Sequence, residues 1–186
     1  MNMDVAQQGQ EPEPFAALLA LAERSASHAR GLPAQIDIAA HWTGVGFTLA
    51  GRRLVAPMNE IAELLAVPAT TRLPGVQEWV RGVANVRGRL LPLIDLEAFF
   101  GSQLTGNRQS HRVLVLELGD LYTGLLVGAV HGMLHFPVDT FHQAPAEVPE
   151  PLRPFVSGGY RLQDQSWAVF SPYALARDVR FFNAAA

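Results

Sequence analysis

The chain contains no cysteine and no lysine, so all 14 of its basic residues are arginine. A chain without cysteine has no disulfide, no thiol nucleophile and no thiolate metal site. Without lysine it cannot form a Gly-x-x-x-x-Gly-Lys phosphate-binding loop. The Gly-x-Ser-x-Gly motif of hydrolases is also missing. These absences argue against nucleotide binding and nucleophilic catalysis.

The chain also has little excess of one charge over the other, because its net charge is only −3. Such a chain has no strong field to attract a phosphate backbone, so we expect no nucleic-acid binding. The apolar run at 15–22 is too short to span a bilayer. Asp4, Glu11 and Glu13 precede it, where a signal peptide would carry positive charge. We therefore expect a cytoplasmic protein with no direct membrane insertion.

The N-terminal part of the sequence separates from the rest by composition. Residues 1–13 are rich in Gln, Glu and Pro, which predicts a disordered tail. Pro14 begins a predicted amphipathic helix, which Gly31 and Pro33 end, and a connector runs to Trp42. The apolar face of this helix either packs against its own domain or contacts a partner or a second copy of the chain.

The remainder has short strands every 8 to 12 residues with turn residues between them, which favours a mainly β barrel or sandwich. Strands are expected at 46–50 and 52–58, with a turn at Gly51. Asn59 is expected to cap a short helix that Pro68 ends. A further strand is expected near 69–73, and the polar loop 102–110 suggests a boundary between two units.

The most informative segment is 80–101, which predicts a hairpin followed by a helix. Gly88 and Arg89 form the expected two-residue turn, because glycine supplies the positive φ at its first position. Asp95 ends the second strand as a helix N-cap. The helix would then stop at Gly101.

The second half of the sequence partly repeats the first. A shift of 69 residues sets Leu49 on Leu118 and Ala56 on Leu125, and a shift of 76 sets Leu93 on Val169 and Asp95 on Ser171. Both Asp95 and Ser171 are capping residues at a strand end. The repeat predicts two small barrels of similar build.

Two strings in the hairpin, GVANVRG at 82–88 and LPLIDL at 91–96, resemble the signature of CheW-like domains, with support from 47–49 and 124–127. These domains are adaptors that couple chemoreceptors to a CheA-type histidine kinase. The resemblance implies two packed five-stranded SH3-like β-barrels with short helices, within 43–182. The barrels would occupy mostly 43–101 and 111–170, with a C-terminal helix at 172–182.

The resemblance also implies partners and contact residues. In the family, the kinase's regulatory domain packs on one barrel, and the cytoplasmic tip of a chemoreceptor enters a groove between the barrels. Residues near the groove would be Ala56, Val86, Arg87, Leu125 and Val127, and Gly82 would face the kinase. Arg87 is equally a candidate for a structural arginine, and Asn85, Gly88, Pro92 and Asp95 are assigned to hairpin and cap geometry. Gly128 departs from the family, whose members often carry an acidic residue there.

Several alternatives remain beside the adaptor. His131 and His135 are four residues apart, but a strand places them about 13 Å apart, so we expect partly exposed histidines beside a sheet edge rather than a metal site, as for His111 and His142. Asp95 lacks a partner for acid–base catalysis, and no cofactor is expected.

A stand-alone adaptor resembling those of type IV pilus chemosensory systems is favoured, which implies control of twitching motility. The other functions considered are a flagellar-type chemotaxis adaptor, a two-barrel small-molecule-binding protein, and a structural dimer formed through the N-terminal helix.

Overall fold

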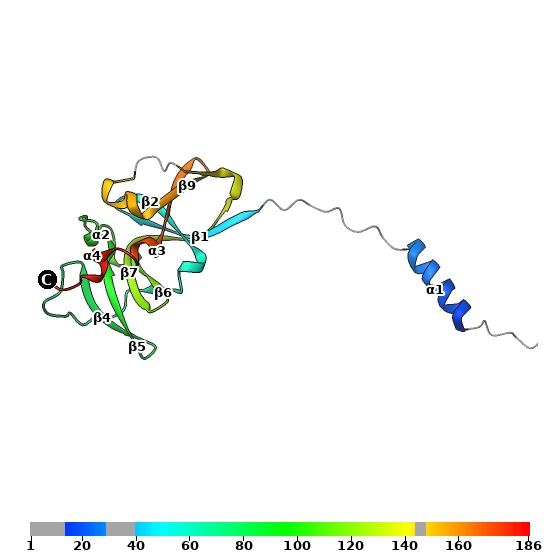
Figure 1. The fold of residues 1–186 in the computed structure, drawn as a ribbon, viewed down its shortest axis with the longest axis horizontal. Coiled ribbons are helices and arrows are strands. Elements are labelled where there is room, and N and C mark those ends of the chain that lie inside the picture. Colours follow the sequence, from blue (N-terminus) through cyan, green and yellow to red (C-terminus); the bar gives the residue numbers. More distant parts are fainter. Residues whose placement is uncertain (1–13, 29–39, 144–147) are drawn as a thin grey trace, which may run out of the picture. The chain divides into compact units, whose positions relative to one another are not determined.

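A computed structural model describes residues 14–28, 40–143 and 148–186, and the chain divides into the units Met1–Ile38 and Ala39–Ala186. The first unit contains one helix, α1 (Pro14–His28) (Figure 1). It begins at the predicted proline and ends three residues before Gly31. Its own unit leaves several large apolar side chains exposed, namely Phe15, Leu18, Leu19 and Leu21. The partner of this face stays a prediction, and the predicted tail 1–13 lies outside the described residues.

The second unit is mainly β, as predicted. Its strands are β1 (His41–Leu49), β2 (Arg52–Pro57), β3 (Glu63–Ala66), β4 (Val80–Val86), β5 (Arg89–Asp95), β6 (His111–Leu118), β7 (Leu121–Pro137), β8 (Phe141–His142), β9 (Val156–Leu162) and β10 (Gln165–Phe170). Its helices are α2 (Leu96–Phe99), α3 (Pro172–Leu175) and α4 (Val179–Phe182), with 3-10 turns η1 (Met58–Glu60), η2 (Arg108–Ser110), η3 (Val138–Thr140) and η4 (Glu150–Phe155).

These strands form two small barrels that share the long strand β7. Strands β3, β4, β5 and β6 pair with one another and with the N-terminal half of β7, and we call this group the β4–β5 barrel. Strands β1, β2, β9 and β10, with the short β8, pair around the C-terminal half of β7 and form the β9–β10 barrel. In Figure 1 the two groups lie one above the other, and β7 lies between them.

The division between the barrels differs from the expected split into 43–101 and 111–170. The hairpin β1–β2 belongs to the barrel of β9 and β10, and the hairpin β6–β7 belongs to the barrel of β4 and β5. The repeat itself is visible in the register: Leu93 pairs in parallel with Gly124, and Val169 pairs in parallel with Val55. The two offsets of 76 and 69 relate these pairs. The two halves of the sequence are therefore similar in structure. In each half, however, the first hairpin pairs into the barrel that contains the last hairpin of the other half.

The buried side chains form three clusters. The β4–β5 barrel encloses Ala84, Leu91, Leu93, Val113, Val115 and Leu126. The β9–β10 barrel encloses Val55, Phe136, Tyr160, Trp167 and Val169. A larger cluster draws on both barrels and includes Phe47, Leu54, Ala56, Ile94, Leu96, Leu125, Val127, Phe155 and Phe170. Successive side chains of a strand point to opposite faces, so β2, β7 and β10 each supply a barrel interior and the shared core.

Several local predictions are wrong, and the strand expected near 69–73 is reduced to one isolated bridge between Thr71 and Val83. At Asn59 the chain makes only the turn η1, and the expected helix is replaced by strand β3, which pairs with β6. Pairing with β6 therefore outweighs the helical spacing of the apolar residues in this segment. Trp42 lies in β1 rather than in a connector and stacks on Tyr160 with ring centroids 5.0 Å apart. The C-terminal helix is broken into α3 and α4, because Asp178 starts a second helix by accepting from Arg180 N–H.

Candidate partner-binding surface

The β4–β5 hairpin turns at Arg87 and Gly88, one residue before the predicted pair Gly88 and Arg89. Val86 pairs with Arg89, and the two residues between them both have positive φ, 51° for Arg87 and 82° for Gly88. Such a turn accommodates glycine at its second position. The Oδ1 atom of Asn85 accepts a hydrogen bond from Gly88 N–H at 2.9 Å, and this bond holds the turn. Arg87 is thereby placed at the tip.

Arg87 links the tip of the β4–β5 hairpin to strand β3, which itself pairs with β6. Its Nη2 donates to Oε1 of Glu63, the first residue of β3. The guanidinium-bearing side chain is nonetheless 78% exposed. Because exposed ion pairs contribute at most about 1 kcal/mol, this contact orients Arg87 more than it stabilises the fold.

The neighbouring residues extend an exposed surface along the hairpin. Arg89 stacks over the ring of Tyr122, 3.8 Å from its centroid, and donates to Glu117 at 3.1 Å. Leu90 is 71% exposed, and Val86 is half-buried against the barrel interior. The tip thus presents a fixed cation beside apolar surface, a composition suited to a protein contact.

Asp95 anchors the base of the hairpin. Its Oδ1 accepts from Ala98 N–H at 3.1 Å, which is the expected cap of α2. Its Oδ2 accepts from Arg81 Nε at 2.9 Å. Asp95 is buried, and its counter-charge is Arg81, a partner that was not predicted from the sequence. Pro92, on the same strand, is exposed and accepts from Thr123 Oγ1 through its carbonyl.

Gly82 is buried by its own chain and is not on a free surface. Its φ is 127°, and a Cβ there would lie 2.0 Å from the carbonyl oxygen of Thr71. Thr71 and Val83 exchange two backbone hydrogen bonds of 2.9 Å. The segment around Thr71 therefore covers the position expected to face a kinase, and Gly82 makes this close approach possible.

Three residues expected near a receptor groove are not surface residues. Ala56, Leu125 and Val127 are fully buried in the core shared by the two barrels. They face inward because they occupy the same side of β2 and β7 as the other residues of that core. A partner cannot touch them in this conformation, so of the expected groove residues only Arg87 and the half-buried Val86 are accessible.

A second buried carboxylate links the two barrels and was also missed. Glu97 of α2 accepts from Ala50 N–H through both oxygens, at 2.8 and 2.9 Å, and from Ser102 Oγ. Ala50 has φ 50° at the β1–β2 turn. Glu97 therefore fixes the start of α2 to the hairpin of the other barrel. Its sequence signal is weak, because a glutamate in a first helical turn is common.

The histidines bond to local groups. His131 Nε2 lies 2.8 Å from Thr48 Oγ1, and His135 Nδ1 lies 2.9 Å from Thr43 Oγ1. Burial, together with the nearby Arg53 guanidinium, lowers the pKa of His131 below 6.5. His111 was expected to be exposed but is buried, with Nε2 donating to the Thr105 carbonyl.

Within the described ranges, His, Asp and Glu side chains nowhere gather in a group of three or more that could bind a metal ion. In the same ranges, no helix has the length and apolar character needed to cross a bilayer.

Comparison with known proteins shows which proteins this chain resembles. Protein PilI of Pseudomonas aeruginosa is 48% identical over 172 residues, which are 92% of this chain and 96% of PilI. Chemotaxis protein CheW of Klebsiella aerogenes is 27% identical over 99 residues, 53% of this chain and 60% of that protein.

Among solved structures, the scaffolding protein TtCheW from Thermoanaerobacter tengcongensis superposes with a TM-score of 0.62 at 25% identity, covering 70% of this chain and 89% of TtCheW. The profile of the CheW-like domain matches residues 43–180, which contain both barrels and α3. The chain belongs to the CheW-like domain family.

Proposed function

We propose that this chain is a non-catalytic adaptor that couples chemoreceptors to a CheA-type histidine kinase. The observation that carries the proposal is the 48% identity to PilI over nearly the whole of both chains. Coupling of receptor and kinase is the general role of CheW-like adaptors. PilI-type adaptors serve type IV pilus chemosensory systems, so the proposed output is twitching motility and the proposed location is a membrane-associated chemoreceptor array.

The proposed receptor contact includes Arg87 and the exposed surface beside it. Glu63 orients the guanidinium, and most of the side chain stays accessible. The pairing leaves guanidinium donors for a carboxylate or carbonyl of a receptor helix. Leu90 and Val86 supply apolar area next to it. Ala56, Leu125 and Val127 lie in the shared core that packs the two barrels together and are proposed to act on this surface only through that packing.

Binding alone does not couple two partners. The ternary complex must favour different kinase conformations in different receptor states, since equal affinity for both conformations would shift nothing. The rigid joint between the barrels suits this task. The shared core and the Glu97 contact with Ala50 tie the surface of one barrel to the other. The regulatory domain of the kinase is therefore proposed to dock on a barrel whose orientation the receptor contact fixes.

Calorimetric titration with the regulatory domain of the CheA-type kinase from the same genome tests the proposal. We expect saturable binding with a micromolar or smaller Kd, which corresponds to a binding free energy of about −8 kcal/mol or more favourable. A second titration adds a soluble receptor-tip fragment to the preformed complex. The absence of heat and of co-elution with a folded kinase domain would refute the adaptor function.

Flagellar-type chemotaxis is the second candidate output, because the chain also matches CheW of Klebsiella aerogenes over about half its length. Complementation separates the two. The chain is expected to restore twitching to a Pseudomonas aeruginosa strain lacking PilI, and not to restore swimming chemotaxis to a strain lacking CheW. Rescue of swimming alone would assign the flagellar output.

A further inference from the structure

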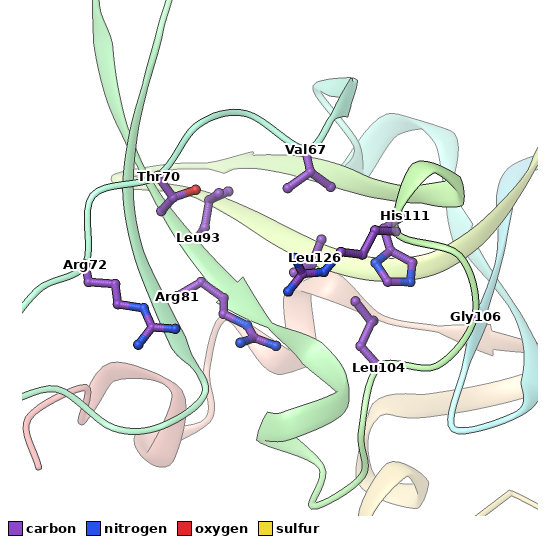
Figure 2. A pocket seen from close by; sticks show the side chains of 10 residues that line it. Val67, Thr70, Arg72, Arg81, Leu93, Leu104, Gly106, His111 and Leu126 are labelled. Atoms are coloured by element: carbon purple, nitrogen blue, oxygen red, sulfur yellow. The ribbon is translucent and has the colours of Figure 1, made fainter.

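A pocket of about 540 Å³ opens on the β4–β5 barrel, away from the hairpin tip (Figure 2). Its apolar lining includes Leu93, Leu104 and Leu126, and its charged lining consists of Arg72, Arg81 and Arg108. No described aspartate or glutamate lines it. A pocket of this size accommodates a small organic molecule or one to a few side chains.

Two of the three arginines form no ion pair with any described residue. Arg81 is neutralised by buried Asp95. Neither Arg72 nor Arg108 forms an ion pair or a side-chain hydrogen bond with any residue in the described ranges. The pocket therefore carries an excess of positive charge beside an apolar wall.

Backbone contacts hold the arginines in place. The double hydrogen bond between Thr71 and Val83 sets Arg72 beside Arg81, and Gly82 permits the close approach. Figure 2 shows the side chains of Arg72 and Arg81 as neighbours that extend in the same direction. Asn107 caps η2 by accepting from Gln109 N–H at 3.0 Å and so fixes the turn that carries Arg108. The backbone segments that carry the three arginines are thus held in place by hydrogen bonds.

We propose that this pocket binds an oxyanion, a carboxylate or phosphate group attached to a partly apolar body. The guanidinium fork of arginine matches both groups with two parallel hydrogen bonds. Arg72 and Arg108 supply the uncompensated charge, and Arg81, occupied at Nε and Nη2, retains its remaining N–H groups. Val67 and Leu104, the more accessible of the apolar lining residues, receive the apolar body. This site is separate from the surface around Arg87 and does not depend on the proposed adaptor function.

Calorimetry with the full-length chain at low ionic strength tests the site with three probes. The first is inorganic phosphate, the second is octyl phosphate, and the third is the peptide acetyl-Leu-Glu-Leu-Glu-amide, with acetyl-Leu-Gln-Leu-Gln-amide as its neutral twin. We expect saturable binding of octyl phosphate or the acidic peptide, at least tenfold tighter than binding of phosphate or the neutral peptide. Which of the two binds more tightly identifies the source of the oxyanion as a small molecule or a protein segment.

Variants locate the binding. R72Q/R108Q is expected to weaken it at least tenfold, whereas R153Q/R161Q, which removes the same charge elsewhere, is expected to change it less than twofold. Leu104→Trp fills the pocket without changing charge and is also expected to weaken binding. Equal losses in the two double variants would show general charge attraction and overturn the proposal. Lack of saturable binding by octyl phosphate and by the acidic peptide would overturn it as well.

Discussion

Arg81 donates from Nε to Oδ2 of Asp95 at 2.9 Å, and the carboxylate that it neutralises is only 1% exposed. The same carboxylate caps α2. Asp95→Asn keeps the size but removes the charge, so we expect a loss of about 1–3 kcal/mol in the free energy of unfolding, measured with urea. Glu150→Gln is the control, because its pair with Arg153 is exposed on both sides. It is expected to change stability by less than about 0.5 kcal/mol. Equal effects of the two variants would contradict this role of Asp95.

Gly82 is expected to tolerate no side chain. Gly82→Ala places a Cβ against the Thr71 carbonyl at a φ of 127°. Strain and overpacking each cost about 1–3 kcal/mol, so together we expect about 3 kcal/mol or more. Gly88→Ala is the matched control, since its φ is also positive but no atom lies within 4 Å of the added Cβ. Its expected cost is about 1–2 kcal/mol. Thermal unfolding of both variants measures the difference, and a Gly82→Ala protein as stable as Gly88→Ala would refute the close approach.

Arg87 is expected to act in binding more than in folding. Arg87→Glu faces Glu63, yet the loss in stability should stay near about 1 kcal/mol, since the pair is exposed. Binding of the receptor tip is expected to fall at least about tenfold, or 1.4 kcal/mol. The double variant R87E/E63R restores the ion pair in reverse. If Arg87 meets the receptor directly, calorimetry will show that stability returns in the double variant and that affinity does not. Recovery of both would assign Arg87 a purely structural role.

Leu125 is expected to matter through packing. It is fully buried in the shared core, so Leu125→Ala is expected to cost about 2–5 kcal/mol. Leu90→Ala, at a 71% exposed site, is expected to cost less than about 0.5 kcal/mol. Urea unfolding ranks the two variants. At a temperature where Leu125→Ala remains folded, its affinity for the receptor tip should equal that of the wild type, and a specific loss of affinity would return Leu125 to the contact surface.

His131 is expected to make the stability of the fold depend on pH. Burial and then Arg53 lower its pKa below the usual 6.5, so the unfolded chain takes up this proton before the folded one does. The stability contribution is complete above pH 6.5 and is lost as the pH falls from 6.5 toward the lowered pKa. In His131→Gln, urea unfolding between pH 7.5 and 5 should show a smaller loss of stability than in the wild type. Arg53→Gln removes one of the two causes and should give an intermediate slope. An unchanged slope in His131→Gln would exclude this histidine as the source.

Local chemistry was predictable from the sequence, and pairing was not. The positions of Asp95 and Ser171 at strand ends predicted both helix caps, and the offsets of 69 and 76 predicted that the two halves are alike, a likeness that the equivalent pairs Leu93–Gly124 and Val169–Val55 confirm. Periodicity cannot say which hairpin pairs with which, so the exchange of β1–β2 and β6–β7 between barrels was missed. Only a partner strand decides whether a half-apolar segment such as 63–66 forms a helix or a strand.

The prediction of the candidate site was poorest for residues whose role depends on whether the fold buries their side chains. Arg87 was placed correctly at the hairpin, although the turn was shifted by one residue. Leu125 and Val127 lie on a strand with apolar residues on both faces, and the sequence does not reveal that each face meets a different core. The pair Arg72 and Arg108 was missed because the two residues lie in separate loops and only tertiary structure brings them to one pocket.

The exchanged hairpins set an order for synthesis on the ribosome. Residues 63–130 contain every strand segment of the β4–β5 barrel, so that barrel can close while the C-terminal third of the chain is still being made. Strand β2 is translated early, but its parallel partner β10 appears only with Ala168 and Val169. Long-range pairings of this kind form slowly. Strand β2 pairs at once with β1, but its other edge stays open until more than one hundred further residues have been made, and an open strand edge is a place where a nascent chain can mispair or meet a chaperone.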